Sequence, residues 1–337
     1  MEYLIEVGDE LAAKDAIKLA RGNRILLWRG DFRNALQLLA AMKRRLRRVP
    51  RGTSPADTFR RYRQATTERS RILSRVQVEL GPGYTLTLPH APDITRACRL
   101  AFGDASDNRM PLTEILGALG ADRWRTRGVH VPALQARIHP HYGVFAPTRQ
   151  EYVDLVAEAP WPRPRTALDI GTGTGVLAAV LAKRGAGHVE AVDIEPRAVE
   201  CARENLARLG LSARTTVSRH DLLPAGKADL VVCNPPWLPG PAATPLDAAI
   251  YDPGSRMLRG FLRNLPRHLS GHGEAWLVLS DLAVRLGLRA GTEALIAAAG
   301  LRVLDRLDIR PRHKVSRDDP LAEYRAAAIT SLWRIRV

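Results

Sequence analysis

The second half of the chain alternates short apolar runs with segments of helical periodicity. Apolar runs that read as strands lie at 166–170, 188–194, 214–220, 228–234 and 273–280. Helical spacing of apolar residues fills 175–185, 195–210, 255–269 and 287–300. Strands that alternate with helices predict a parallel sheet covered by helices on both faces. Two further strands, 301–310 and 326–337, follow with no helix expected between them, so we expect a closing hairpin and one antiparallel strand.

This pattern predicts an α/β fold with a seven-stranded, doubly wound, mostly parallel sheet. The first 130 residues follow a different pattern. Apolar residues at helical spacing fill 26–46 and 56–76, and 107–124 is a shorter helical piece. Two alternating segments around Gly81-Pro82-Gly83-Tyr84 predict a hairpin over 76–88. We therefore expect a mainly helical domain at 1–130, a connector with a leading helix at 131–160, and the α/β domain at 161–337.

Charge changes the picture of the N-terminal domain. The net charge is +16, and Lys43 to Arg75 holds twelve Lys or Arg side chains against two acidic ones. Such a balance favours an acidic partner such as nucleic acid or a ribonucleoprotein, and binding through this stretch would weaken steeply with salt. An arginine-rich composition from a GC-rich genome, or a solvated helix face, explains the same charge equally well.

Several classes of protein are disfavoured. The N-terminus, MEYLIEVGDE, is acidic where a secretory signal would be basic, and no apolar run is long enough to span a bilayer. The three cysteines are far apart in sequence, which favours reduced thiols over a disulfide framework or a zinc cluster. We therefore expect a cytoplasmic protein without a membrane partner or a metal site.

Candidate chemistry begins at the first strand-to-helix turn, LDIGTGTGVLAA. Three glycines, Gly171, Gly173 and Gly175, permit backbone angles and close ligand approach that a side chain would block. Asp169 precedes them at the strand end, and the next strand ends in Asp193, an acid that can accept both ribose hydroxyls. The dinucleotide fingerprint would need glycine at Val176, and no Gly-Lys-Ser or Gly-Lys-Thr follows. The loop suits a cationic nucleoside without phosphates.

These residues resemble those of the class I S-adenosylmethionine-dependent methyltransferases, from about Val144 to the C-terminus. The resemblance implies S-adenosylmethionine as cofactor, with its methionine part along the glycine loop and Asp169 holding its amino group, directly or through water. It implies that Asp193 binds the ribose hydroxyls and that Asp221 accepts from the adenine amine, although a helix N-cap explains Asp221 equally well. The cofactor-binding residues implied in this way are Asp169, Gly171, Thr172, Gly173, Gly175, Asp193, Ile194, Asp221 and Asn234.

A second motif, Asn234-Pro235-Pro236-Trp237, follows the fourth strand of this sheet. The lone pair of a planar amine is conjugated, so the nitrogen is a poor nucleophile until hydrogen-bond acceptors hold its NH2. Asn234 supplies a side-chain carbonyl, and Pro235 a backbone carbonyl whose direction its ring restricts. Pro236 stiffens the loop, and Trp237 offers a face on which a planar amide or base can stack. Orientation and aimed dipoles would then dominate catalysis.

The motif resembles the Asn-Pro-Pro-aromatic sequence of N-methyltransferases in the methyltransferase small domain group, with Trp237 where Tyr or Phe is usual. Two families of this group compete. Release-factor glutamine methyltransferases share the domain order, and their segment before the glycine loop is similar to residues 143–156. This resemblance implies that Phe145, Pro147 and Thr148 lie near the cofactor. The chain departs from that family in having Thr148 where a second proline is usual and in having a longer N-terminal part. Ribosomal RNA guanine N2-methyltransferases share the catalytic motif.

The segment Thr244 to Leu262 follows the motif closely, and we expect it to cover the substrate pocket, with Tyr251 and Arg256 in contact with the substrate. Alternatively, the segment is only a surface loop followed by a core helix, with no role in substrate binding. The whole pattern predicts an enzyme that methylates a planar NH2 group with S-adenosylmethionine. A protein glutamine of the translation machinery ranks first, an exocyclic amine in RNA second and one in DNA third. A nucleic-acid-binding protein that has lost catalysis is a further alternative.

Overall fold

The computed structural model describes residues 3–47, 49–104, 108–242, 245–313, 315–316 and 318–337. Internal contacts divide the chain into two units, Met1–Arg123 and Trp124–Val337. The boundary falls inside the helix α5 (Leu112–Arg127). The division expected from the sequence, at 1–130, 131–160 and 161–337, stays a prediction.

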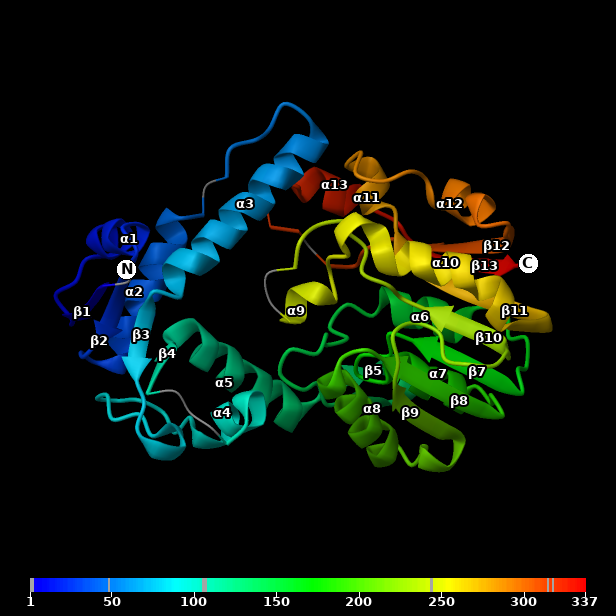
Figure 1. Cartoon of the computed structure of the whole chain (residues 1–337), viewed down its shortest axis with the longest axis horizontal. Helices are drawn as coiled ribbons and strands as arrows, with labels where there is room; N and C mark the ends of the chain where they lie inside the picture. Colours follow the sequence, from blue (N-terminus) through cyan, green and yellow to red (C-terminus); the bar gives the residue numbers. More distant parts are fainter. Residues whose placement is uncertain (1–2, 48, 105–107, 243–244, 314, 317) are drawn as a thin grey trace. The chain divides into compact units, whose positions relative to one another are not determined.

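The first unit contains a small sheet with helices around it (Figure 1). Its strands have the order β1-β2-β3-β4; the first three are parallel and β4 is antiparallel to β3. The elements are β1 (Tyr3–Val7), α1 (Ala13–Arg21), β2 (Arg24–Trp28), α2 (Phe32–Arg45), α3 (Pro55–Leu73), β3 (Val76–Glu79), the 3-10 turn η1 (Pro82–Tyr84), α4 (Thr95–Phe102), β4 (Arg109–Pro111) and α5. Trp28, Leu39 and Met42 are fully buried in its core.

The unit is mainly helical, as expected, but the sequence pattern did not predict its small sheet. Strand β2 occupies the apolar run that the sequence pattern merged with the following helix. Asp31 ends that run and caps α2 by accepting from the Arg33 amide. The hairpin expected over 76–88 was wrong: β3 pairs with β2 and β4, and within 76–88 only Gly81 and Thr85 form an antiparallel bridge. The chain turns there at Tyr84, whose φ is +66° and whose ring is buried in the core.

The second unit contains the larger sheet. Its first elements are β5 (Val129–Val131), η2 (Pro132–Leu134), β6 (Ala136–Ile138), α6 (Glu151–Glu158), β7 (Thr166–Ile170), α7 (Val176–Lys183), β8 (His188–Asp193), α8 (Pro196–Arg208), η3 (Ser212–Arg214) and β9 (Thr215–Arg219). There follow β10 (Ala228–Cys233), α9 (Pro245–Ala248), η4 (Pro253–Ser255), α10 (Arg256–His268), β11 (Leu269–Ser280), α11 (Leu282–Arg285), α12 (Thr292–Ala298), β12 (Arg302–Ile309), α13 (Ala322–Ala327) and β13 (Thr330–Arg336).

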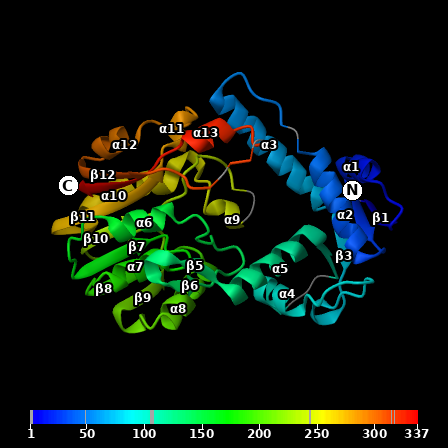
Figure 2. The same cartoon turned by 180° about the vertical axis from the view of Figure 1, so that it is seen from behind.

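The seven strands have the order β12-β13-β11-β10-β7-β8-β9, which confirms the predicted fold class (Figure 2). One strand, β13, is antiparallel to both of its neighbours, as expected. The closing pair differs from expectation in one respect, because the short helix α13 lies between β12 and β13 in sequence. Strand order reverses between β7 and β10, and such a switch point opens a crevice at the carboxyl ends of the strands.

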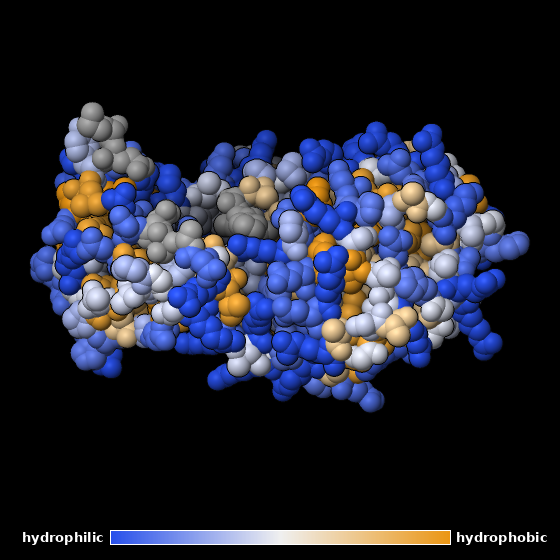
Figure 3. All heavy atoms as spheres, turned by 60° about the horizontal axis from the view of Figure 1, so that its bottom comes forward, coloured by the Kyte–Doolittle hydropathy of each residue, from blue (hydrophilic) through white to orange (hydrophobic). Residues whose placement is uncertain are grey.

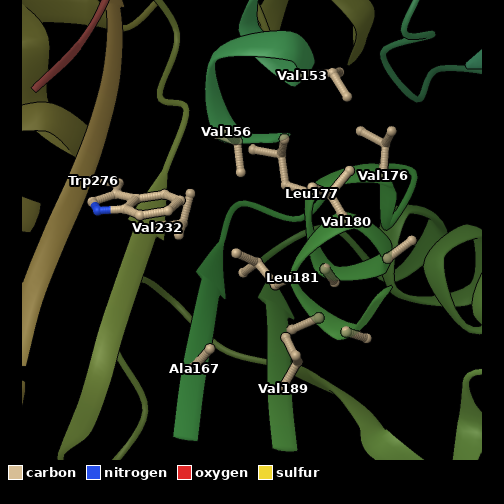
Figure 4. Close-up of a cluster of buried hydrophobic side chains, with 14 of the residues drawn as sticks. Val153, Val156, Ala167, Val176, Leu177, Val180, Leu181, Val189, Val232 and Trp276 are labelled. Atoms are coloured by element: carbon tan, nitrogen blue, oxygen red, sulfur yellow. The ribbon is translucent and has the colours of Figure 1, made fainter. Parts of the chain in front are cut away.

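Both faces of the central strands β7, β10 and β11 are buried, with alternate residues pointing to opposite helical layers. On one face α6 and α7 pack on side chains that include Val232 and Trp276, and Figure 4 shows Val156, Val180 and Leu181 turned toward the sheet. On the other face α10 and α12 cover side chains of the same strands that point the opposite way. The sheet is thus fixed from both sides, which holds the strand ends at the crevice.

The exterior is largely hydrophilic, with small apolar patches between charged side chains in the view of Figure 3. Among the described residues, no helix is long and apolar enough to cross a membrane.

Candidate active site

A cavity of about 940 Å³ lies in the second unit, where the loops after β7, β8 and β10 meet. Most of the residues singled out from the sequence lie on its wall. They are Phe145, Thr148, Gly171, Thr172, Gly173, Asp193, Ile194, Asp221, Asn234, Pro235, Pro236, Trp237, Tyr251 and Arg256. Residues that are up to about a hundred positions apart in sequence therefore share one cavity because their strands end at the same edge of the sheet.

The glycine loop has the backbone that its sequence implies. Gly171, Gly173 and Gly175 have φ values of +72°, +55° and +79°, in the left-handed region that favours glycine. A Cβ at Gly171 would come within 2.9 Å of the Met257 Cε, across the cavity wall. A Cβ at Gly175 would instead meet Ala202 of α8 at 3.1 Å, and Gly175 is not on the wall. The loop thus combines ligand access at Gly171 with close helix packing at Gly175.

Asp193 connects the loop to the end of β8. Its Oδ2 accepts from the Gly173 amide at 2.9 Å, and its Oδ1 accepts from the Glu195 amide at 3.0 Å. Burial raises the pKa of Asp193, and the backbone hydrogen bonds partly offset this effect. Each carboxylate oxygen can accept a second hydrogen bond. The arrangement therefore holds the carboxylate in place on the cavity wall with acceptor capacity to spare.

Asp169 lies behind the loop instead of on the cavity wall. Only 1% of its surface is exposed, and its Oδ2 accepts from the Thr172 hydroxyl at 2.6 Å and the Ala178 amide at 3.0 Å. Burial raises the pKa of Asp169 to about 6. Its observed contacts hold the loop and the start of α7, and its expected contact with the cofactor's amino group stays a prediction. Pro147 is likewise not among the wall residues.

The Asn-Pro-Pro-Trp segment follows β10 at the switch point. The Trp237 indole Nε1 donates a hydrogen bond of 2.9 Å to the Asn234 side-chain oxygen. Trp237 also packs against the hydrophobic clusters on both faces of the sheet. An amide oxygen has two lone pairs, so Asn234 retains one acceptor position. The hydrogen bond from Trp237 thereby fixes the orientation of the Asn234 side-chain amide. The ring of a Phe or Tyr at this position has no N–H group and would not make this hydrogen bond.

The chain beyond this motif returns to it. Leu238 forms a parallel bridge with Tyr251, through hydrogen bonds from the Leu238 amide to the Ile250 carbonyl and from the Asp252 amide to the Leu238 carbonyl. Residues 248–253 and Met257 line the cavity. The segment from Thr244 to Leu262 thus contributes wall residues, and its expected role as a cover with substrate contacts stays a prediction. Thr244 lies outside the described residues.

Asp252 is a site residue that the sequence reasoning missed. It is 6% exposed, lies on the wall, and its carboxylate accepts from the Arg256, Met257 and Leu258 amides at the start of α10. The sequence Asp-Pro-Gly-Ser at 252–255 comes directly before a segment with helical spacing of apolar residues, and this pattern could have predicted a helix start at Asp252. Arg149 and His220 also line the cavity, and no spacing in the sequence marked them.

Comparison with known proteins identifies the fold around this cavity. Residues 135–283 match the family model of the methyltransferase small domain. This part of the chain belongs to the class I S-adenosylmethionine-dependent methyltransferases. The match contains both the glycine loop and the Asn-Pro-Pro-Trp segment of the methyltransferase domain.

Curated relatives of the methyltransferase domain carry several names. A release factor glutamine methyltransferase from Cereibacter sphaeroides is 34% identical over 166 residues, which is 44% of this chain and 57% of the relative. A ribosomal protein L11 methyltransferase from Dechloromonas aromatica is 39% identical over 121 residues, 36% of this chain and 40% of the relative. A tRNA1(Val) (adenine(37)-N6)-methyltransferase from Porphyromonas gingivalis is 40% identical over 83 residues, 22% of this chain and 32% of the relative. The chain thus spans between about a third and somewhat over half of these relatives.

Family membership implies S-adenosylmethionine, and the methyltransferase domain fits it. The cavity is large enough for a nucleoside joined to an amino acid and for an acceptor group beside it. Its wall carries Asp193 and Glu195 next to the glycine loop, and such carboxylates suit a positively charged ligand. Asp193 would hold the ribose hydroxyls, and the open glycine loop would face the methionine part.

Proposed function

We propose that this chain methylates a planar NH2 group, and that the group is a glutamine side chain of a protein of the translation machinery. The observation that carries the proposal is the Asn234 side-chain oxygen at the switch-point end of β10, on the wall of the same cavity as Asp193 and held by Trp237. This is the position in the fold where a planar amine can meet a cofactor bound along the glycine loop.

The chain's own residues would prepare the acceptor. The Asn234 oxygen accepts one N–H of the NH2 group and the Pro235 carbonyl accepts the other, which favours a nitrogen geometry with a freer lone pair. Because Trp237 already occupies one lone pair of Asn234, the remaining acceptor direction is fixed before the substrate arrives, and such preorganisation lowers the cost of reaching the transition state. When bound, S-adenosylmethionine supplies a methyl group already activated by a positive sulfur. The displaced proton can pass to water after transfer.

A glutamine is favoured over other amines by two observations. The release factor glutamine methyltransferase alignment is the longest of the three described above, at 166 residues. The leading segment contributes Phe145 and Thr148 to the cavity wall. The expected glutamine amide is small, flat and neutral, and the Trp237 ring in the wall offers a face for it.

An exocyclic amine of an RNA base is the second candidate. Arg256 and Arg263 lie on the cavity wall, and no ion pair of their side chains to a carboxylate is found within the described parts of the chain. Free guanidinium groups at a site of NH2 methylation suit a substrate that carries phosphates. A base amine would use Asn234, Pro235 and Trp237 in the same way.

The experiment that tests the proposal is tritium transfer from methyl-labelled S-adenosylmethionine into a lysate of cells that lack this protein. Asn234→Ala is compared with Asn264→Ala, because Asn264 also lines the cavity and its side chain donates to the Gly260 carbonyl within α10. We expect protease-sensitive label with the wild type and Asn264→Ala, and none with Asn234→Ala. RNase-sensitive label would favour the second candidate. Equal label with both variants, or no binding of S-adenosylmethionine, would contradict the proposed function.

A further inference from the structure

The helix α10 carries a row of arginines on its exposed side. Arg256, Arg259, Arg263 and Arg267 are all exposed and are spaced three or four residues apart, so they share one face. The opposite face is buried against the sheet through side chains that include Leu258, Phe261 and Leu265. At 1.5 Å per residue the row is about 16 Å long. The helix contains no acidic residue.

These four arginines differ from several other arginines of the same unit, which form ion pairs. Arg285 pairs with Asp281, Arg306 with Asp308 and Arg312 with Asp154. No such ion pair is formed by the side chains of the α10 row within the described residues. The acid at the start of the helix, Asp252, is buried and already accepts three backbone amides. The positive charge of the row is therefore not compensated locally.

A groove of about 270 Å³ runs beside this row, between α10 and α12, which lie side by side in Figures 1 and 2. Its lining combines the three guanidinium-bearing side chains Arg256, Arg259 and Arg263 with apolar residues such as Leu262 and Leu295, and none of its lining residues is acidic. The groove thus has a cationic rim and an apolar floor.

A fifth arginine reinforces the positive field. Arg289 has two guanidinium nitrogens that are buried without a hydrogen-bond partner among the described residues. Burial lowers the pKa of Arg289; the negative charge of Asp252 opposes this effect, and the positive charge of Arg259 adds to it. An anion near Arg259 and Arg289 would offset the positive charge of both side chains.

The groove shares two wall residues with the proposed active site. Arg256 and Arg263 line both the groove and the large cavity that contains Asn234. A chain bound along α10 would therefore contact two residues of the cavity wall.

We propose that the arginine groove of α10 and α12 binds the sugar–phosphate backbone of single-stranded RNA. Guanidinium groups match phosphate oxygens in pairs, and phosphates keep their charge at every physiological pH. The groove has room for one nucleotide-sized group and not for a duplex, and RNA presents such single strands in loops and ends. The apolar floor can take a base or ribose. This inference goes beyond the proposed methyl transfer, because RNA would bind whether or not its own base is the acceptor.

The test uses the full chain, without S-adenosylmethionine, and a fluorescently labelled single-stranded RNA of mixed sequence, about twenty nucleotides long. Binding is measured by anisotropy over a series of salt concentrations. The triple variant Arg259→Gln, Arg263→Gln, Arg267→Gln is compared with the control Arg285→Gln, Arg306→Gln, Arg312→Gln, which loses the same charge from paired arginines. A third variant replaces the three α10 arginines by lysine.

Each phosphate contact contributes about 0.7 to the slope of log affinity against log salt for a single strand, so we expect the α10 variant to lose about 2 from this slope. We expect its affinity at low salt to fall at least tenfold, the control to match the wild type, and the lysine variant to retain most of the slope. Equal losses in both glutamine variants would show dependence on net charge alone and overturn the proposal. Equally tight binding of duplex DNA would also overturn it. So would a result in which the α10 arginines are needed to bind polyglutamate and not to bind RNA, because that result would indicate an acidic protein partner.

The basic stretch Lys43 to Arg75 in the first unit stays a separate prediction. Several of its arginines have structural partners, such as Arg61 with Asp57 and Arg75 with Asn23, while Arg48 lies outside the described residues. Any salt dependence that remains in the α10 variant would measure the contribution of such other basic surfaces, so the two predictions are tested separately.

Discussion

Replacing Trp237 by Phe should slow methyl transfer without weakening cofactor binding. Phe keeps an aromatic face and most of the packing against the sheet but has no ring N–H. The change therefore removes the 2.9 Å hydrogen bond from the indole to the Asn234 oxygen. Asn234 then loses the contact that distinguishes its oxygen from its nitrogen, and the acceptor for the substrate NH2 is no longer held in one orientation.

The size of the effect follows from that single bond. A hydrogen bond between neutral groups contributes about 0.5–1.5 kcal/mol net. If the bond acts only by orienting Asn234, its loss raises the barrier by the same amount, which corresponds to a rate about 2- to 10-fold lower. The dissociation constant of S-adenosylmethionine should stay within about twofold of the wild type, because Trp237 acts on the acceptor side.

The assay measures the initial rate of tritium transfer into acceptor lysate, with cofactor affinity measured by calorimetry. Trp161→Phe is the matched control: Trp161 packs on the same cluster and stacks on Arg184, and it does not line the cavity. The control should keep the wild-type rate. An unchanged rate in Trp237→Phe, or a rate loss matched by an equal loss of cofactor affinity, would refute the reasoning.

Three further changes test other parts of the site. Asp193→Ala should weaken S-adenosylmethionine binding at least tenfold by calorimetry, since a hydrogen bond to a charged group contributes about 1.5–3 kcal/mol, and unchanged affinity would contradict the ribose role. Gly171→Ala should lower both melting temperature and cofactor affinity because φ is +72° and Met257 is 2.9 Å from the new Cβ; Gly185→Ala, with φ +96° and open space, should lower only the melting temperature. Asp169→Asn should remove a pH dependence of stability. The pKa of Asp169 is about 6 in the folded chain and near 3.8 in the unfolded chain, so its contribution to stability is fully present below pH 3.8 and is lost as pH rises through 6. The melting temperature of the variant relative to wild type should therefore rise between pH 4 and 7.

Much of the methyltransferase domain could be predicted because its local signals agree with its tertiary structure. Apolar runs, helix periodicity and the turn chemistry at Gly171 and Gly173 all belong to a sheet that is buried on both faces. Strand ends then bring Asp193 and Asn234 to the same edge by topology alone. For these residues the position along the strand was sufficient to predict their place on the cavity wall.

The first unit could not be predicted in the same way. Its strands are short, and β2 is followed after three residues by α2, so the apolar run reads as the start of the helix. Side-chain contacts were also beyond the sequence pattern. Nothing in the spacing shows that Asp169 turns inward to Thr172 and Ala178, or that the Trp237 indole reaches Asn234. These depend on side-chain directions that only the packed structure determines.

A methyl group on an amide nitrogen is released by strong acid, whereas a methyl group on an amine is not, so acid hydrolysis identifies the acceptor. Protein labelled by the wild-type chain from tritiated S-adenosylmethionine is isolated and hydrolysed completely in strong acid, and volatile base is collected. Hydrolysis of an N-methylated glutamine amide releases labelled methylamine, so the account predicts that most of the label becomes volatile and that none is formed with Asn234→Ala. Label that stays with amino acids after hydrolysis, as it would on a lysine or an α-amine, would contradict the account.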